Sequence, residues 1–464
     1  MDTLLILLAL ALLIVAAYRG GSVILFAPLA ALLAVLLTSP RLVLPVYSNV
    51  FMERAVEFLR LYFPVFLLGA VFGKLMEISG FARAIIQTAL RFIGPRHAIV
   101  AVVASCALLT YGGVSLFVVV FTIYPFAAEL FRSVNVPKRL LPATIALGAF
   151  TFTMDALPGS PQIQNIIPTS FFKTTAWAAP TLGLIGAVFI AVLGIVYLEW
   201  RRRTAERAGE GYGSNHINEP AQSASPRQVG ILLALLPLVV VAALNFKLSS
   251  VFPAYFGPRI DFAAAGMPGP APIETGKLTA IWAVECALFA GIGMVLLSSW
   301  KSVRGTIGPA LSVAVAGAML AALNTASEYG FGAVISQLPG FRTVSHLLTT
   351  SITDPLLNLA VTTNILAGMT GSASGGMSIA LAALGDTYIA QAAAAGIPSE
   401  VLHRVAAMAS GGMDTLPHNG AVITLLTITG LRHVQSYMDI FVLTLIKTAA
   451  GTAIIGVYYL THWV

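Results

Sequence analysis

Long apolar runs, separated by short polar stretches, make up most of this chain. A helix needs about 20 apolar residues to cross the hydrocarbon core of a bilayer, and many of the runs approach or exceed that length. A soluble helix carries only one apolar stripe, so this pattern predicts an all-α polytopic membrane protein. The runs lie at about residues 3–17, 21–38, 55–80, 97–125, 140–172, 176–199, 229–246, 278–300, 306–338, 355–385, 404–430 and 438–462.

Two of the runs are interrupted by a short polar segment. The first reads Met154-Asp155-Ala-Leu-Pro-Gly-Ser-Pro-Gln-Ile-Gln-Asn165, and the second reads Met413-Asp414-Thr-Leu-Pro-His-Asn-Gly420. Proline deletes a backbone donor and clashes with the preceding turn, so neither run can form one continuous helix. Unwound backbone at membrane depth is tolerated only where protein buries it or where it lines a wet cavity. Two such breaks in corresponding halves point to the binding site of a transporter.

The two halves of the sequence align with one constant shift of 259 residues, which is the separation of Asp155 and Asp414 (414 − 155). No gap is needed between the first and last matched pairs. An internal duplication of this kind predicts two repeats, at 1–200 and 229–464, joined by a polar linker at 201–228. The matched pairs are Phe72/Phe331, Gly73/Gly332, Gly112/Gly371, Ser115/Ser374, Met154/Met413, Asp155/Asp414, Leu157/Leu416 and Pro158/Pro417.

Basic residues in the short loops predict the orientation of the chain in the membrane. The loop with Arg201, Arg202 and Arg203 and the loop with Lys301 and Arg304 are expected in the cytoplasm. The linker that follows Arg203 is therefore expected to be cytoplasmic, and counting the spans outward from it predicts that both termini are periplasmic.

The same counting predicts one re-entrant hairpin in each half. Run 97–125 has basic residues before and after it, so it must leave the membrane on the side from which it entered, with a tip near 110–115. Its counterpart in the second half has a tip near 370–376 and opens to the opposite side. Each half then holds about five full spans, one hairpin and one broken helix. An odd number of spans inverts the second half, which gives inverted-topology repeats.

The hairpin tips and the helix breaks form the candidate substrate site. A half-helix that begins at a tip points its free N–H groups at the middle of the membrane, where they attract an anion. Hydroxyl and amide side chains add donors that recognise ligand oxygens without a full charge. The candidates are Tyr111, Gly112, Gly113, Ser115, Ser160, Gln162, Gln164, Asn165, Thr370, Gly371, Ser372, Ser374, His418 and Asn419.

Each of these candidates also has an interpretation without a ligand. Gly and Ser in membrane helices allow close packing of neighbouring helices. Gln162 and Gln164 can cap carbonyls of the unwound backbone, and His418 can be a hydrogen-bonded core histidine. The relation of all four interruptions by one shift favours the ligand site.

Three acidic residues at membrane depth are the candidates for ion coupling. Asp155 and Asp414 open the two breaks, and Glu328 lies in the run 306–338. Placing a carboxylate inside a membrane costs free energy, so an acidic residue at this depth indicates a function. Three roles remain open for the aspartates: protonation in step with transport, coordination of Na⁺, or acceptance of hydrogen bonds from the broken backbone. Glu328 has no acidic counterpart in the first half, which suggests a role that the halves do not share.

Composition supports the membrane assignment and excludes some other classes. The chain is 58% hydrophobic and 10% charged, with a mean hydropathy of +0.88. The net charge of +7 does not indicate a nucleic-acid partner, because the basic residues cluster in short loops between spans. Cys106 and Cys286 lie in separate apolar runs, with no His or Cys at ligand spacing. The sequence therefore predicts no disulfide, no metal site and no cofactor.

These motifs resemble the gluconate permease (GntP) family of the ion transporter superfamily, and most of all its hydroxybutyrate-permease branch. The resemblance implies transport of a small hydroxy-carboxylate, with 3-hydroxybutyrate favoured, by proton symport across the bacterial inner membrane. It also implies a homodimer in which a transport domain with the hairpins and broken helices moves as an elevator against a scaffold. The residues that carry it are Asp155–Asn165, Asn324–Gly332, Thr370–Gly376 and Met413–Gly420.

Several alternatives remain beside this prediction. Gluconate or another sugar acid is the alternative substrate, and sodium is the alternative coupling ion. Sodium is disfavoured because the tips lack the Ser-Asn-Thr signature of the superfamily's sodium-coupled dicarboxylate carriers. An intramembrane aspartyl protease would use Asp155 and Asp414 as an acid/base pair, but equivalent positions in a repeat suit this poorly. A channel fits less well than a carrier, because the hairpins open to opposite faces. The prediction is a transporter and not an enzyme.

Overall fold

The computed structural model shows an almost entirely helical protein. Two of the candidate substrate residues, Ser115 and His418, lie outside the residues that it describes, as does most of the run 3–17. The described residues are 8–9, 11–13, 15, 22–114, 116–214, 217–219, 229–264, 266–267, 272–340, 343, 352–417 and 419–464.

In the first half, the apolar runs fold as helices, which satisfy their backbone polar groups within one segment. The 97–125 run divides into two helices and the 140–172 run into three. The α-helices are α2 (Val23–Thr38), α3 (Val43–Val46), α4 (Met52–Ile78), α5 (Phe81–Ile93), α6 (Ala98–Tyr111), α7 (Leu116–Ser133), α8 (Leu141–Ala149), α9 (Phe152–Asp155), α10 (Ile163–Phe172) and α11 (Pro180–Arg207).

In the second half, the runs from 355 onward divide at corresponding points. The α-helices are α12 (Ile231–Phe256), α13 (Thr279–Val303), α14 (Ile307–Gln337), α16 (Pro355–Thr370), α17 (Ala373–Ala394), α18 (Ser399–Gly412), α19 (Gly420–Thr429) and α20 (His433–Thr461). The remaining elements are the short helices η1 (Pro40–Leu42), η2 (Tyr47–Phe51), η3 (Pro95–His97), η4 (Lys138–Leu140) and η5 (Thr275–Lys277), and the strands β1 (Arg259–Ile260) and β2 (Ile273–Glu274), which pair antiparallel.

Six helical segments among the described residues are long and apolar enough to cross a membrane. This supports a multi-pass membrane protein. The helices of the hairpins and of the broken runs are shorter or more polar than these six. The six segments are Pro40–Ile78, Pro180–Arg207, Ile231–Phe256, Thr279–Val303, Ile307–Gln337 and His433–Thr461.

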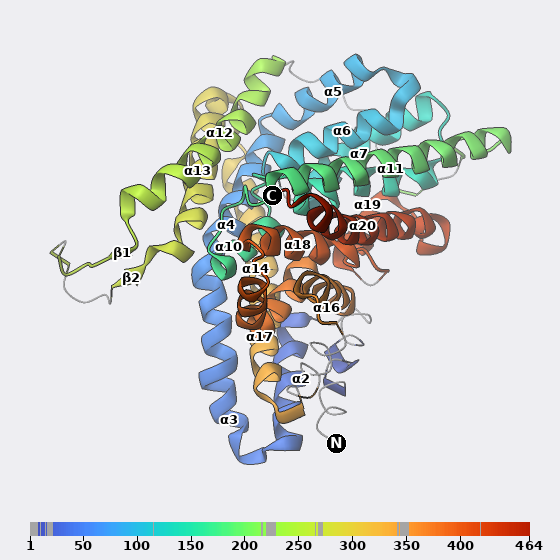
Figure 1. Ribbon diagram of the computed structural model, residues 1–464. Helices are drawn as coiled ribbons and strands as arrows, with labels where there is room; N and C mark the ends of the chain where they lie inside the picture. Colours follow the sequence, from blue (N-terminus) through green and yellow to red (C-terminus); the bar gives the residue numbers. More distant parts are fainter. Residues whose placement is uncertain are drawn as a thin grey trace.

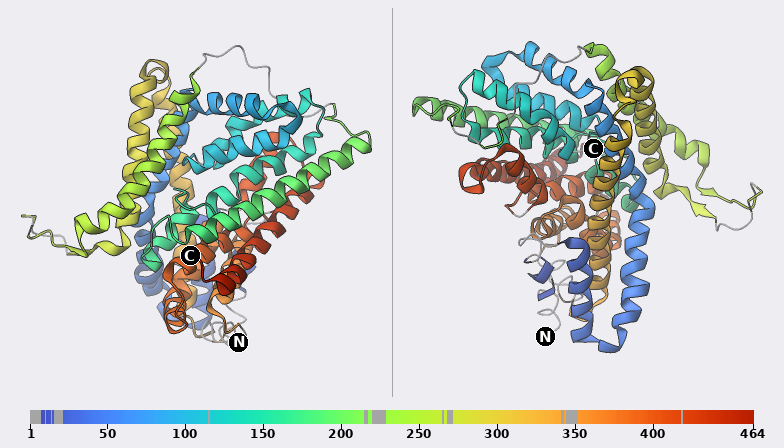
Figure 2. Two further views of the ribbon diagram at one scale, coloured as in Figure 1. Left: turned by 45° about the horizontal axis from the view of Figure 1, so that its top comes forward. Right: turned by 180° about the vertical axis from the view of Figure 1, so that it is seen from behind.

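The helices form two groups that cross each other (Figure 1). In the first group, α4 and α14 pack along each other, α2 packs on α14, and α13 packs on both α4 and α12. We call α2, α4, α12, α13 and α14 the upright bundle. In the second group, α11 and α20 lie side by side and run across α4 and α14, as the views in Figure 2 also show. We call α6 to α11 and α16 to α20 the crossed bundle.

The order of elements repeats with the shift that the sequence shows. Helix α4 ends at Ile78 and α14 ends at Gln337, and the separation is again 259 (337 − 78). The first arms of the two hairpins, α6 and α16, end at Tyr111 and Thr370, with the same separation (370 − 111). These two pairs of helix ends therefore have the same separation as the matched residues, and the division into two repeats stays a prediction.

Two segments differ from the simple division into spans and loops. The segment 247–277, which lies between the apolar runs 229–246 and 278–300, continues α12 as far as Phe256 and then forms the β1–β2 hairpin. The first residues of the expected linker continue α11 to Arg207. The residues that extend α11 beyond its apolar run, Arg201 to Arg207, are mainly Arg, Ala and Glu, which favour a helix. In α12, Pro253 is accommodated inside the helix.

Parts of the linker lie against both halves of the protein. Glu210 forms an ion pair with Arg139 at 2.6 Å, and Glu219 forms one with Lys138 at 2.8 Å. The Asn218 side chain donates to a carbonyl of α19 at 2.9 Å. These contacts dock described parts of the linker on the loop before α8 and on the end of α19.

Candidate functional site

Each hairpin turns at a glycine in the left-handed region. Gly113 follows α6 with φ of +96°, and Gly371 follows α16 with φ of +66°. Only glycine adopts these angles without strain, which explains why both tips carry glycine. We call residues 110–114 tip 1 and residues 370–374 tip 2. The helix breaks are residues 156–162, which we call break 1, and residues 413–419, which we call break 2.

Most polar side chains at break 1 satisfy the unwound backbone. The Ser160 hydroxyl donates to the Thr153 carbonyl at 2.7 Å, and the Asn165 amide donates to two carbonyls, each at 2.8 Å. The Tyr111 hydroxyl, which comes from tip 1, donates to the Pro158 carbonyl at 2.9 Å. A buried carbonyl without a partner is costly, so these side chains stabilise the break itself.

A side-chain amide ties each break to the tip of its own half. Gln162 donates to the carbonyls of Thr110 at 2.7 Å and Val114 at 3.2 Å. Asn419 donates to the Gly371 carbonyl at 2.6 Å and also caps the start of α19. The structure therefore pairs tip 1 with break 1 and tip 2 with break 2. Among the described residues, no side-chain hydrogen bond joins the two tips.

The two breaks meet where α9 packs on the end of α18. A Cβ at Gly411 would collide with the Asp155 carboxyl, so the glycine admits that side chain. The buried Arg404 guanidinium donates to the Asp155 carbonyl at 3.1 Å, to Asn165 Oδ1 at 3.0 Å and to the Ala178 carbonyl at 2.7 Å. One arginine from the second half thus holds the unwound backbone of the first half. One oxygen of the Asp155 carboxyl, Oδ1, is buried and without a hydrogen-bond partner.

Asp414 has a different environment from Asp155. Its Oδ1 accepts from Lys447 Nζ at 2.5 Å, and both side chains are buried. Lys447 also donates to the Phe150 carbonyl at 3.4 Å, just before break 1. No hydrogen bond between Asp155 and Asp414 is found among the described residues, as a protease-like pair would need. Asp414 is a member of a buried ion pair that joins α20 to both broken runs.

Glu328 lies at tip 2. The residue is 2% exposed and belongs to α14 of the upright bundle. A Cβ at Gly375, in the first turn of α17, would collide with the Glu328 carboxyl, and Oε2 of that carboxyl has no hydrogen-bond partner. Thr325, one turn earlier on α14, shares a hydrogen bond of 3.2 Å with Ser374. Ser372 caps α17 by accepting from the Gly375 N–H at 3.0 Å.

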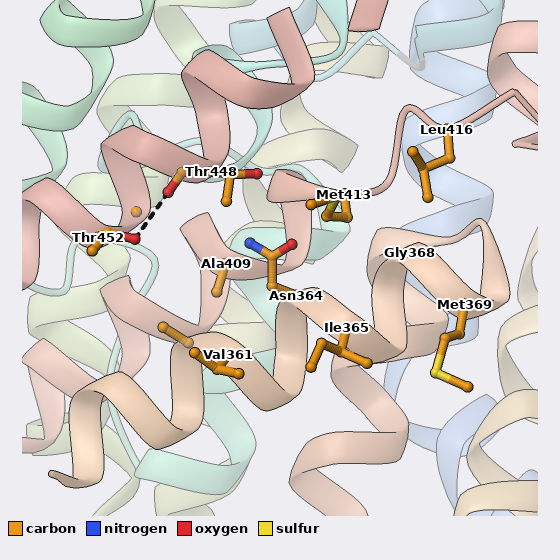
Figure 3. Close-up of a pocket in the computed structure, with 12 residues that line it drawn as sticks. Val361, Asn364, Ile365, Gly368, Met369, Ala409, Met413, Leu416, Thr448 and Thr452 are labelled. Atoms are coloured by element: carbon orange, nitrogen blue, oxygen red, sulfur yellow. Dashed lines mark hydrogen bonds between the residues drawn. The ribbon is translucent and has the colours of Figure 1, made fainter. Parts of the chain in front are cut away.

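A cavity of about 440 Å³ lies beside break 2, between α16, α18 and α20 (Figure 3). Asn364 points into it, and the oxygen of its side-chain amide is buried and without a partner. The other lining side chains are mainly apolar, apart from two threonines of α20. The lining residues are Ala360, Val361, Asn364, Ile365, Gly368, Met369, Ala409, Met413, Leu416, Thr448, Gly451 and Thr452.

The candidate residues of the sequence therefore divide into two groups. Those that stabilise turns, caps or unwound backbone are Tyr111, Gly112, Gly113, Ser160, Gln162, Asn165, Thr370, Gly371 and Asn419. Those that keep a buried polar atom without a partner are Gln164, Asp155 and Glu328, whereas Ser372 caps α17 and Ser374 shares a hydrogen bond with Thr325. The second group holds the groups that remain available to a ligand or a proton.

Four polar residues of this region were not among the candidates. Arg404, Lys447 and His403 are all buried, and His403 contacts Asn165 at 3.2 Å. Asn364 lines the cavity. The signal that identifies the two cations is their position inside or at the edge of apolar runs, where a charge is costly and calls for a partner. Their partners lie far away in the sequence, so the sequence could not supply them.

Comparison with known proteins gives one close relative. The chain is 54% identical over 469 residues to a Bacillus subtilis (strain 168) protein described as an uncharacterized transporter, YxjC, and the match covers 99% of each chain. The crystal structure of the Alcanivorax borkumensis YdaH transporter resembles the fold with a TM-score of 0.49 at 15% identity, over 92% of this chain and 90% of that one. No family model matches the chain.

Proposed function

Because the chain belongs to the same transporter family as YxjC, we propose that it is a secondary active transporter for a small hydroxy-monocarboxylate, driven by protons across the bacterial inner membrane. The observation that carries the proposal is tip 2. There a helix of 22 residues, α17, begins inside the protein, with Ser372 as its N-cap and Ser374, Gly375 and Gly376 in its first turn. Free N–H groups and the positive end of the helix dipole make such a helix start suitable for a carboxylate.

The cavity beside break 2 supports a short substrate. Gly368 lies two residues before the end of α16, so the cavity reaches close to tip 2. Its lining offers one amide and two hydroxyls among apolar side chains, which suits 3-hydroxybutyrate with its single hydroxyl and methyl group. Gluconate carries a hydroxyl on nearly every carbon and would leave several of them without partners. We therefore favour the short hydroxy acid over the sugar acid.

Transport proceeds by an elevator movement between inverted repeats in this proposal. The crossed bundle holds both hairpins and both breaks, so it is the moving unit. The upright bundle holds two long helices that correspond in the two repeats, α4 and α14, and these pack along each other, so it is the fixed unit. A homodimer formed through the fixed units completes the carrier. Both termini are outside and the linker is cytoplasmic.

Coupling to protons follows from the buried acids. Asp414 already has Lys447 as its partner, whereas Asp155 and Glu328 each keep one carboxyl oxygen without a hydrogen bond. A carboxylate that moves through the membrane region without a partner is expensive, and a proton removes the charge. Sodium remains the alternative ion.

Uptake into proteoliposomes tests this function. We expect an inward proton gradient, without Na⁺, to drive uptake of radiolabelled (R)-3-hydroxybutyrate, and we expect excess gluconate to compete poorly. Uptake of gluconate but not of (R)-3-hydroxybutyrate would change the assigned substrate to a sugar acid and leave the assignment as a carrier unchanged. Uptake only in the presence of Na⁺ would change the assigned coupling ion from the proton to sodium. Equal flow in both directions that never exceeds the external concentration would indicate a channel and contradict the proposal.

A further inference from the structure

Tip 2 brings a carboxyl group of one bundle to a helix start of the other. Glu328 stands on α14, and its carboxyl lies against Gly375 in the first turn of α17. The Glu328 carboxyl can approach α17 this closely because Gly375 has no Cβ. The same face of α14 continues this contact one turn on, where a Cβ at Gly332 would come within 2.9 Å of Ile379. The position of Glu328 is therefore set by helix packing.

The polar groups around Glu328 include hydroxyls of tip 2 and of α14. Ser372 is a hydrogen-bonding neighbour of its carboxyl, and Thr325 and Ser374 lie beside it. The elements packed on α14 are α2, α4, α17 and η2. From the described parts of these elements, no Asp, Glu, His, Lys or Arg side chain forms an ion pair with Glu328 or acts on its charge. Glu328 therefore differs from Asp414, which has Lys447, and from Asp155, which lies near Arg404 and Lys447.

We propose that Glu328 and the carboxylate of the substrate share the start of α17, so that binding of the substrate anion requires Glu328 to take up one proton. This inference rests on the proposed function and deepens it, because it assigns the coupling to one of three acids.

The physical reason is repulsion between like charges in a buried site. Two carboxyl groups within contact distance cannot both stay ionised, and one of them binds a proton, as in acidic pairs of enzymes. When the substrate enters as an anion, its carboxylate accepts from the free N–H groups of α17. A proton from water then moves onto the Glu328 carboxylate, which becomes a neutral carboxyl. One monocarboxylate and one proton together add no net charge to the loaded carrier.

Proton uptake on ligand binding tests this assignment directly. The purified full-length protein, in lightly buffered detergent solution with a pH-indicator dye, is mixed with (R)-3-hydroxybutyrate, with gluconate or with acetate. Binding is measured in parallel by calorimetry. The set comprises the wild type, Glu328→Gln, Glu328→Ala and the control Glu285→Gln, which removes another acid from a membrane helix, α13. Glu328→Ala removes the carboxyl with a different change of volume, so the test does not depend on one variant folding.

At pH values where Glu328 is ionised in the free protein, the wild type and Glu285→Gln are expected to take up about one proton for each carboxylate bound, and their affinity is expected to fall about tenfold per pH unit. Both Glu328 variants are expected to bind the carboxylate without proton uptake and with an affinity that does not change with pH. Full proton uptake in a folded Glu328 variant would overturn the inference and leave the proposed function standing. Failure of the folded wild type to bind any of the three carboxylates would overturn the proposed function itself.

Discussion

At the scale of single residues, the buried charges of this protein serve different purposes. Arg404 uses its donors on carbonyls and on an amide oxygen of the first half, so it supports an unwound segment. Lys447 neutralises Asp414. Glu328 has neither kind of partner and lies against a helix start. The acid that lacks a cation is the one suited to exchange a proton, because a paired acid is already compensated.

Loss of Lys447 is expected to be more harmful than loss of the whole pair. Lys447→Met leaves a buried carboxylate unpaired and should destabilise the protein by about 3–5 kcal/mol. The double variant Asp414→Asn, Lys447→Met removes both charges and should recover at least half of that loss. Thermal unfolding of the purified variants in detergent measures both effects. A double variant as unstable as Lys447→Met alone would show that the pair does not explain the burial of Asp414.

At the scale of elements, glycine sets how closely the arms of the second hairpin approach. A Cβ at Gly376 of α17 would collide with the backbone N of Ala367 on α16. The arms pack backbone to backbone there, and this contact fixes the tip where Ser372 lies beside Glu328 and Ser374 shares a hydrogen bond with Thr325. Close packing through small residues is common between membrane helices. In this hairpin it also determines the geometry of the candidate site.

Gly376→Ala is expected to separate the hairpin arms. The added methyl group overpacks the contact and should cost about 1–3 kcal/mol, with loss of carboxylate uptake because the tip moves. Gly293→Ala is the matched control: this residue lies inside helix α13 with open space around its Cβ. Alanine there should be neutral or should stabilise by up to about 1 kcal/mol. Thermal unfolding and proteoliposome uptake measure the pair. Equal behaviour of the two variants would contradict the packing argument.

At the scale of the whole molecule, the linker holds parts of the two halves together. The Arg139 side chain donates hydrogen bonds to Glu210 and also pairs with Asp439 of α20. The hydrogen bond from Arg139 lowers the pKa of Glu210 below its ordinary value of 4.5. Both groups lie outside the spans. The linker is therefore a structural part of the crossed bundle as well as a connection between the repeats.

The contact of Glu210 predicts a pH dependence of linker docking. A carboxyl whose pKa is lowered in the docked state stabilises that state above pH 4.5 and loses the stabilisation as the pH falls below it. Glu210 is partly exposed, so the gain is at most about 1 kcal/mol. Hydrogen–deuterium exchange of residues 208–214, corrected for intrinsic rates, measures docking.

Glu210→Gln should exchange faster than the wild type at pH 7, and the difference should vanish in acid. A difference that persists unchanged at pH 3 would contradict this explanation.

The sequence by itself determined where the chain turns and breaks. Pro158 and Pro417 each lack a backbone donor, and Gly113 and Gly371 permit left-handed turns, so local chemistry favours both breaks and both tips. Proline alone does not decide a break, because Pro64, Pro168 and Pro253 lie inside helices. The constant shift of 259 residues between matched positions predicted the repeat. The ends of α4 and α14, and of α6 and α16, are separated by the same shift. These features depend on neighbours in the chain, which a sequence displays.

Only the tertiary structure decided which polar groups are occupied. Ser160, Gln162 and Asn165 look like ligand groups in the sequence, but they hold carbonyls of the unwound backbone. Lys447 reaches the Phe150 carbonyl across 297 residues of sequence, and Glu328 meets Gly375 from another bundle. The amino-acid composition of a helix break shows how many hydrogen-bond donors its side chains supply. Their partners depend on distances between helices, which packing alone sets.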